Sequence, residues 1–167
     1  MKKTILLLML TSINGFTQAR APKGADREVI AAVIVAESGG HGVSGMEAVY
    51  EVIHARASQR GTTCIEEALK SKLVNGKRIH QFSCLNNTTP TELWWKMRNH
   101  PSYWMVHDYI LKWVPASSHT GTNPYNRATH YHAHSVNPYW AKGHKPVASF
   151  GGHKWYKGIA PYNKKSK

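Results

Sequence analysis

The segment DREVIAAVIVAESGG, residues 26–40, joins an unbroken apolar run to a single carboxylate and a pair of glycines. The apolar residues fall on nearly every side of a helical projection, which is typical of a helix in the core of a soluble protein. We therefore expect a helix over residues 26–37 that ends at Gly39-Gly40. Glu37 stands at its end, where partial desolvation favours the protonated acid that general-acid catalysis needs. The alternative is an ordinary solvent-exposed glutamate.

The first 19 residues are predicted to be a cleaved signal peptide. A charged start at Met1-Lys2-Lys3 precedes an apolar stretch over residues 5–10 and a small-residue site at 17–19. A membrane anchor is the alternative, but the stretch is much shorter than the roughly 20 residues that span a bilayer. No later segment is expected to be apolar enough to span one. We expect one folded domain over residues 20–162, a basic tail over 163–167, and a monomeric, secreted or periplasmic protein without stable membrane insertion.

The chain that remains after export would be strongly basic. Removing residues 1–19 takes away two lysines and leaves 20 basic against 9 acidic residues, a formal net charge of +11. This charge indicates an anionic partner, such as nucleic acid, anionic lipid or the acidic cell wall of bacteria. Export makes nucleic acid the least suitable of the three, and we expect no nucleic-acid partner.

The two cysteines, Cys64 and Cys84, lie 20 residues apart. An even number of cysteines in an oxidising compartment predicts one disulfide between them. Two unpaired buried thiols are the alternative.

Helical patterns continue after the first helix. Ser44 with Glu47, and Thr63 with Glu66, have the spacing of a capping box and predict two helix starts. Gly61 is expected to end the first of these helices. A polar loop through Asn75-Gly76 follows the second, and two further helices are predicted over residues 91–98 and 102–114, the last ended by Pro115. The tryptophans that we expect in the core are Trp94, Trp95, Trp104 and Trp113.

The pattern changes in the last part of the chain. Residues 117–127 have loop composition, residues 128–133 have strand composition, and a strand over 147–156 is interrupted at Gly151-Gly152. The predicted fold class is therefore α+β, a mainly helical body with a small antiparallel sheet at its C-terminal end.

Several short motifs occur in one order between residues 27 and 156. They are Ala36-Glu37-Ser38-Gly39-Gly40, Gly45-Met46-Glu47-Ala48-Val49 with Val52-Ile53 and Arg56, Gln81-Phe82-Ser83, Ala128-Thr129-His130-Tyr131, Pro138-Tyr139-Trp140-Ala141 and Gly152-His153. Together they resemble the SleB/CwlJ family of cell wall hydrolases. The resemblance implies a fold similar to goose-type lysozyme and lytic transglycosylases, peptidoglycan glycan strands as substrate, and Glu37 as catalytic acid. The chain departs from the family pattern at His41, where Glu is frequent, and at Ala55, where Asn is frequent.

The number of carboxylates bears on the type of reaction. Retaining and inverting glycosidases use a pair of carboxylates at a defined separation. Lytic transglycosylation, which the resemblance implies, needs only one. Glu47 and Glu51 lie four residues apart on the second helix, where we expect them to cap and solvate it. We therefore favour a lytic transglycosylase that cuts between N-acetylmuramic acid and N-acetylglucosamine, with Glu37 as acid and base. Hydrolysis with a second carboxylate or water is the alternative.

Candidate substrate-binding residues lie in the later motifs. Gln81 and Ser83 offer polar groups suited to sugar hydroxyls and N-acetyl groups. On the predicted strand, Thr129 and Tyr131 share one face and His130 lies on the other. Tyr131 is the best candidate for a polar group near the reacting bond. The remaining candidates are Tyr139 and Trp140, which are able to stack on a sugar ring, and His153.

The histidine-rich strand offers a rival interpretation. His130, His132 and His134 alternate along it, so three imidazoles would lie on one face, with His153 as a fourth ligand. This spacing is compatible with zinc and with a metal-dependent cell wall hydrolase. The chemistry that the resemblance implies needs no cofactor, and we expect none. A cationic wall-binding module without activity is a third interpretation, but it leaves Glu37 unexplained.

Overall fold

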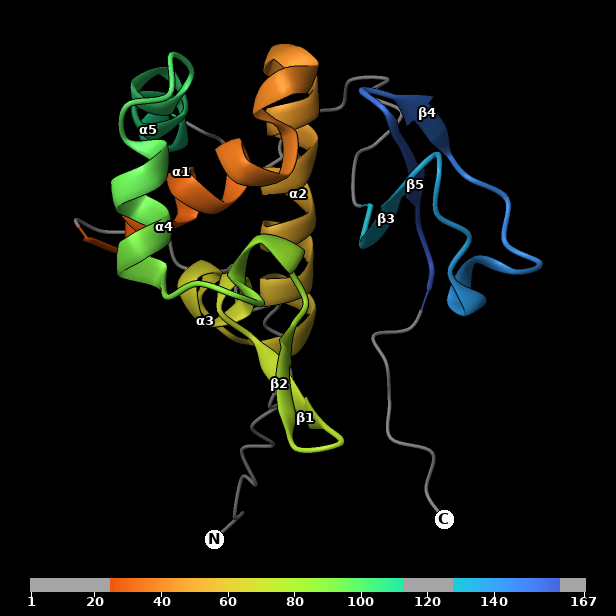
Figure 1. The fold of residues 1–167 in the computed structure, drawn as a ribbon. Coiled ribbons are helices and arrows are strands. Elements are labelled where there is room, and N and C mark those ends of the chain that lie inside the picture. Colours follow the sequence, from red (N-terminus) through yellow and green to blue (C-terminus); the bar gives the residue numbers. More distant parts are fainter. Residues whose placement is uncertain (1–24, 113–127, 160–167) are drawn as a thin grey trace, which may run out of the picture.

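The computed structural model describes residues 25–112 and 128–159. The predicted signal peptide, the loop over 117–127, the basic tail, Trp113 and Pro115 lie outside these residues. Within them, helices form the first part of the chain and a small sheet forms the last part (Figure 1). The predicted α+β class is confirmed.

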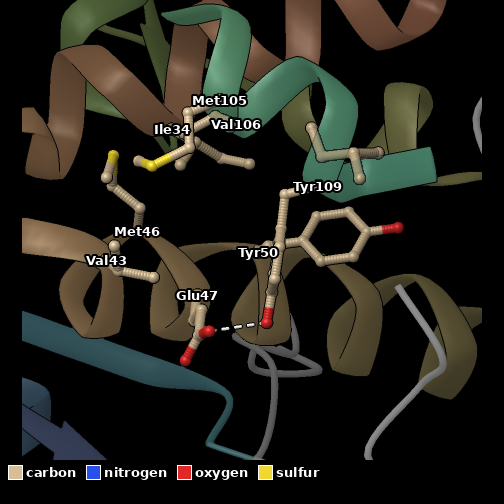
Figure 2. Close-up of a pocket in the computed structure, with 9 residues that line it drawn as sticks. Ile34, Val43, Met46, Glu47, Tyr50, Met105, Val106 and Tyr109 are labelled. Carbon is tan, nitrogen blue, oxygen red and sulfur yellow. Dashed lines mark hydrogen bonds between the residues drawn. The ribbon is translucent and has the colours of Figure 1, made fainter. Parts of the chain in front are cut away.

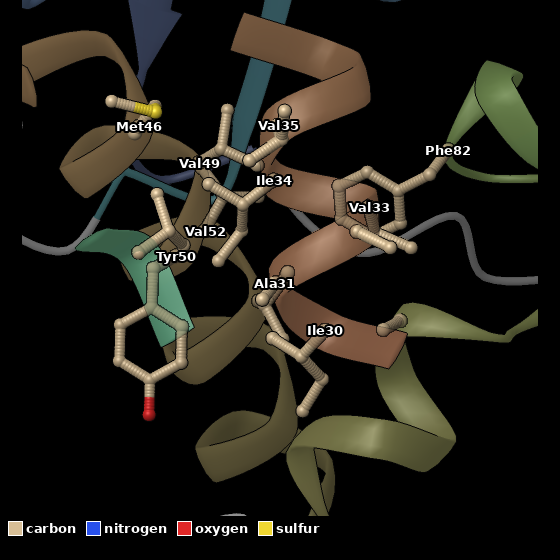
Figure 3. Close-up of a cluster of buried hydrophobic side chains, with 14 of the residues drawn as sticks. Ile30, Ala31, Val33, Ile34, Val35, Met46, Val49, Tyr50, Val52 and Phe82 are labelled. Carbon is tan, nitrogen blue, oxygen red and sulfur yellow. The ribbon is translucent and has the colours of Figure 1, made fainter. Parts of the chain in front are cut away.

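Helix α1 (Ala25–Ser38) is the centre of the helical body. Residues 30–35 are all buried, and the helix contacts every other helix of the body. A helix surrounded in this way needs apolar residues on all sides, which is the pattern in the sequence. Phe82 joins this core from the loop segment beside α1 (Figure 3). The other helices are α2 (Gly42–Arg60), α3 (Cys64–Ala68), α4 (Pro90–Met97) and α5 (Tyr103–Lys112).

Helix α2 begins earlier than predicted. A 3-10 turn, η1 (Gly39–His41), leads directly into the helix, so Ser44 lies inside it and caps nothing. The predicted capping box of Ser44 and Glu47 is therefore wrong. The predicted end is confirmed, because Gly61 adopts the left-handed conformation with φ 64° and its N–H bonds to carbonyls of the last turn.

The capping box predicted for α3 is confirmed. The Thr63 side chain accepts a hydrogen bond from the Glu66 N–H, and the Glu66 carboxylate accepts one from the Thr63 N–H at 2.8 Å. Thr89 and Glu92 form the same arrangement at the start of α4, which the sequence reasoning missed.

The loop expected around Asn75-Gly76 is a β-hairpin. Strand β1 (Ser71–Val74) pairs antiparallel with β2 (Lys77–His80), and Asn75 and Gly76 turn with φ of 49° and 74°. The loop prediction is wrong because these strands are mostly exposed on both faces, so they lack the alternation that marks a half-buried strand. The Asn-Gly pair is the signal that was available. A 3-10 turn, η2 (Ser83–Leu85), follows.

The C-terminal sheet has three antiparallel strands in the order β3-β5-β4. Strand β3 (His130–Ala133) lies within the predicted strand at 128–133. The predicted strand at 147–156 is two strands, β4 (Ala148–Phe150) and β5 (His153–Tyr156). Gly151 and Gly152 turn the chain back between them, with φ of 56° and 70°.

The two faces of this sheet have different surroundings. Tyr131 and Trp155 are cross-strand neighbours and pack against the core of the helical body. The 3-10 turn η4 (Tyr139–Ala141) lies at the opposite face, where the rings of Trp140 and Tyr156 have centroids 5.3 Å apart. The face that carries Tyr131 is therefore the one turned toward the helices.

Two of the tryptophans expected in the core are on the surface. Trp95 and Trp104 are 57% and 53% exposed, whereas Trp94 is half-buried against the core. The prediction is wrong for Trp95 and Trp104 because they lie on the outer faces of α4 and α5.

One helical run among the described residues, 25–60, is long and apolar enough to cross a membrane by length and composition. The expectation that no later segment meets this criterion is therefore wrong. The turn η1 divides this run into α1 and α2, which pack against each other. Half of the most apolar part of the run is buried inside the protein. These features are those of core helices.

Candidate active site

Glu37 lies in the last turn of α1 and is partly exposed. Its two carboxylate oxygens accept hydrogen bonds from two different segments. Oε1 accepts from the Cys84 N–H at 3.1 Å and from the Ser83 hydroxyl at 3.3 Å, and Oε2 accepts from the Tyr131 hydroxyl at 3.0 Å. The structure thus brings Ser83 and Tyr131, both predicted site residues, to Glu37.

The surroundings of Glu37 are more polar than the sequence suggested. The helix is no longer buried on all sides at this end, since Ala36 is on the surface whereas Val35 and Ser38 are buried. Hydrogen-bond donors, rather than apolar side chains, surround the carboxylate. Donors of this kind orient a carboxylate and hold it in one position.

Tyr131 and Cys84 both remain protonated beside Glu37. Burial raises the pKa of the Tyr131 hydroxyl, and the charge of Glu37 raises it further. The same two causes, in the same order, raise the pKa of the Cys84 thiol. Both groups therefore act as donors toward Glu37 at neutral pH.

His153 lies next to Tyr131, with ring centroids 5.2 Å apart. Burial lowers the pKa of His153, and the neighbouring His41 lowers it too, while the Gly151 carbonyl and Glu37 act in the opposite direction. Its Nδ1–H donates to the Gly151 carbonyl at 2.7 Å, so Nε2 keeps a free lone pair. A neutral imidazole with one accepting nitrogen is therefore part of the site.

His41 packs against the glycine turn that precedes His153. A Cβ atom on Gly152 would come within 2.8 Å of the His41 ring, and one on Gly151 would come within 3.3 Å of its Cβ. The rings of His41 and His153 meet edge to face, with centroids 5.1 Å apart. Glycine therefore suits both positions, because it allows the positive φ of the turn and leaves room for the close approach of His41.

Gln81 and Thr129 bond to Arg56, and Gln81 also bonds to Glu67, rather than to Glu37. The Gln81 amide donates to the Glu67 carboxylate at 2.7 Å, and its carbonyl accepts from Arg56 at 3.1 Å. Thr129 is 2% exposed, and its backbone carbonyl accepts from Arg56 at 2.5 Å. The amide of Gln81 and the backbone carbonyl of Thr129 are thus engaged within the protein, although Gln81 is only half-buried.

Glu67 and its ion pair with Arg60 were missed by the sequence reasoning. Glu67 is 1% exposed and bonds to Arg60. The available signal was its place directly after the capping Glu66, because successive residues of a helix point about 100° apart and Glu67 therefore points to a different side of α3.

Three other candidates lie at the opposite face of the sheet. The rings of His130 and Trp140 have centroids 5.1 Å apart there. Tyr139 is 86% exposed next to Lys142. Successive residues of a strand point to opposite faces, so His130 points away from Tyr131. The structure does not bring His130, Tyr139 or Trp140 to Glu37.

The histidines of β3 have other partners than a metal ion. The Nε2 atom of His132 accepts from the Tyr156 hydroxyl at 2.9 Å, and its Nδ1–H donates to the Ala133 carbonyl at 2.8 Å. His153 lies opposite Ala133 in the sheet and therefore on the other face from His132. Over residues 25–112 and 128–159, no group of three or more His, Cys, Asp or Glu is arranged to hold a metal. The prediction that the histidines of this strand and His153 bind one zinc ion together is therefore wrong.

The expected disulfide is not formed, and Cys64 and Cys84 are both free thiols. Cys64 is buried against Tyr50, and burial raises the pKa of its thiol to about 11. The Cys84 thiol interacts with Glu37. The alternative of two unpaired thiols describes the structure.

Glu47 and Glu51 do not cap and solvate α2 as expected. Glu47 accepts a hydrogen bond from the Tyr109 hydroxyl at 2.5 Å, beside an apolar pocket between α1, α2 and α5 (Figure 2). Glu51 is 3% exposed, and burial raises its pKa to about 7. Glu37 does not line this pocket.

Comparison with known proteins identifies the family. No curated protein and no solved structure matches the chain. A family model described as Cell Wall Hydrolase matches residues 40–156, which include Ser83, Tyr131 and His153 and begin three residues after Glu37. Because this match covers more than half of the chain and includes the groups that surround Glu37, the protein belongs to the SleB/CwlJ family of cell wall hydrolases, enzymes that act on peptidoglycan.

Proposed function

We propose that the protein is a lytic transglycosylase that cleaves the glycan strand between N-acetylmuramic acid and N-acetylglucosamine, with Glu37 as general acid and base. Membership of the family supports an enzyme of the cell wall. The observation that carries the finer proposal is the hydrogen bonding of Glu37. Both oxygens of one partly exposed carboxylate are held, from two separate segments, at the end of a buried helix.

The reaction needs a single carboxylate. In the first step the Glu37 acid gives its proton to the glycosidic oxygen while the bond from that oxygen to the muramoyl C1 breaks. The bonding electron pair stays with the leaving oxygen, and C1 takes on oxocarbenium character. In the second step the Glu37 carboxylate takes the proton of the muramoyl C6 hydroxyl as O6 attacks C1. A 1,6-anhydro ring closes, and Glu37 is protonated again.

The neighbouring groups have supporting roles in this scheme. Tyr131 and Ser83 orient Glu37, and His153 packs beside Tyr131 with an Nε2 that is able to accept a hydrogen bond. General acid–base catalysis by a group positioned in this way contributes about 10²–10⁴-fold.

Hydrolysis is the second candidate, and the neutral His153 favours it. Its free Nε2 is able to take a proton from a water molecule that attacks C1 in place of O6. The product would then carry a reducing muramic acid end instead of an anhydro ring.

The proposal extends to the fold and to the cell. We propose a lysozyme-like catalytic domain over residues 20–162, exported as a monomer after removal of residues 1–19. The buried helix that ends at Glu37, with a small sheet beside it, supports the first part. The charged and apolar start of the sequence supports the second.

Mass spectrometry of digested sacculi tests the proposal. Lytic transglycosylation releases anhydro-muropeptides, hydrolysis releases muropeptides with reducing ends, and peptide-bond cleavage releases free peptides. Anhydro-muropeptides as the main product support the proposal. Reducing ends favour the second candidate, and free peptides with intact glycan strands would refute glycan cleavage altogether.

A further inference from the structure

Arg56 on α2 contacts both segments that hold Glu37. Its Nε donates to the Thr129 carbonyl at 2.5 Å, and its Nη1 donates to the Gln81 Oε1 at 3.1 Å. Its guanidinium carbon also lies 5.8 Å from the centroid of the Phe82 ring. One side chain thus bonds to the segment before η2 and to the start of β3.

The two contacts lie next to the two groups of donors. Gln81 directly precedes the segment in which Ser83 and Cys84 bond to Oε1 of Glu37. Thr129 precedes by two residues the tyrosine whose hydroxyl bonds to Oε2. Because only one residue separates the two along the backbone, a shift of the Thr129 carbonyl is expected to move that tyrosine with it.

We infer that Arg56 is a positioning residue, which aligns the donors Ser83, Cys84 and Tyr131 on Glu37 by holding their two segments at a set separation. The inference rests on the proposed role of Glu37. An arginine suits this task because its planar guanidinium presents several donors in fixed directions. A lysine has the same charge but offers only a compact ammonium group at the end of a flexible chain.

Glu67 fixes the orientation of the bridging amide. The Gln81 NH₂ group donates to the buried Glu67 carboxylate at 2.7 Å, which leaves the amide oxygen turned toward Arg56. Arg60, which lies one turn after Arg56 on α2, bonds to the same carboxylate. Burial lowers the pKa of Arg56, whereas the charge of Glu67 raises it, and an arginine stays protonated at any pH that the protein tolerates.

The substitution Arg56→Lys tests the inference with soluble peptidoglycan fragments as substrate. We expect kcat to fall by about tenfold or more with KM little changed, since misplacement of catalytic groups by about 1 Å can cost about 10²-fold. Arg78→Lys is the matched control, because Arg78 makes a comparable hydrogen bond at 3.0 Å to the Ser71 hydroxyl in the exposed hairpin, where it has no contact with the groups that hold Glu37. It is expected to change kcat by less than about twofold.

A double-mutant comparison separates positioning from a merely structural role. In a Ser83→Ala/Tyr131→Phe background two of the three aligned residues no longer donate, so Arg56→Lys should lower kcat by a clearly smaller factor than it does in the wild type. A full additional loss in that background, or a wild-type kcat for Arg56→Lys, would overturn the inference. If Arg56→Lys does not fold, Gln81→Met removes one of the two contacts and enters the same comparison, with the same outcomes deciding. Full activity of Glu37→Gln would instead refute the proposed function.

Discussion

Replacing Glu37 with glutamine removes the titrating group but leaves its hydrogen-bond partners in place. The amide oxygen of Gln can accept from the Cys84 N–H and the Ser83 hydroxyl, as Oε1 does now at 3.1 and 3.3 Å. Its NH₂ group would face Tyr131, whose hydroxyl can rotate and accept instead of donating. Only one of the three hydrogen bonds changes direction, so we expect the free energy of unfolding to change by about 1 kcal/mol or less.

The expected effect on activity is much larger than the effect on stability. Loss of general acid–base catalysis costs about 10²–10⁴-fold in rate. At about 1.4 kcal/mol per factor of ten, this is about 3–6 kcal/mol of activation free energy. The assay is the rate of release of soluble muropeptides from purified sacculi, and urea denaturation of the same preparation measures stability.

Glu66→Gln is the matched control for this experiment. It makes the same chemical change at an exposed carboxylate, and glutamine also serves at this position of a capping box. We expect its activity to stay within about twofold of the wild type. If Glu37→Gln loses less than about tenfold in activity, the assignment of Glu37 as general acid is refuted.

Three further predictions concern charge and the buried groups. Burial raises the pKa of Glu51 from 4.5 to about 7, so the native state holds a proton that the unfolded chain has released, and the free energy of unfolding falls as pH rises through this range. In urea denaturation, Glu51→Gln should therefore gain stability relative to the wild type between about pH 5 and 8, and a difference independent of pH would contradict this. In the absence of reductant, the unfolded protein should show two free thiols. In the native protein, Cys64 should resist alkylation at neutral pH because its pKa is raised to about 11. Peptide mapping that finds Cys64 joined to Cys84 would disprove the prediction of free thiols. Binding to sacculi should weaken as the salt concentration rises above about 0.1 M, where the Debye length is about 10 Å. The turnover of short uncharged fragments should stay nearly constant over the same range. Binding that does not depend on salt would exclude charge as the means of wall attachment.

Local patterns in the sequence were sufficient for the helical core. The all-round apolar run of α1 predicted a buried helix, and residues 30–35 are buried in the structure. The Thr63–Glu66 capping box and the stop at Gly61 were also predicted. These features depend on neighbours within about four residues along the chain, so the sequence states them directly. The same reasoning singled out Glu37, Ser83 and Tyr131 from their motifs.

The tertiary structure alone decided which of the other residues reach Glu37. The hydrogen bonds from Cys84 and Tyr131 join residues 47 and 94 positions away from Glu37. Strand alternation separates Tyr131 from His130, but it does not say which face meets the helices. Gln81 has the polar groups of a substrate ligand, yet Arg56 and Glu67 occupy both ends of its amide. The sequence alone determines which chemical groups each side chain carries. Which partner such a group bonds to depends on the distant segments that pack beside it in the fold.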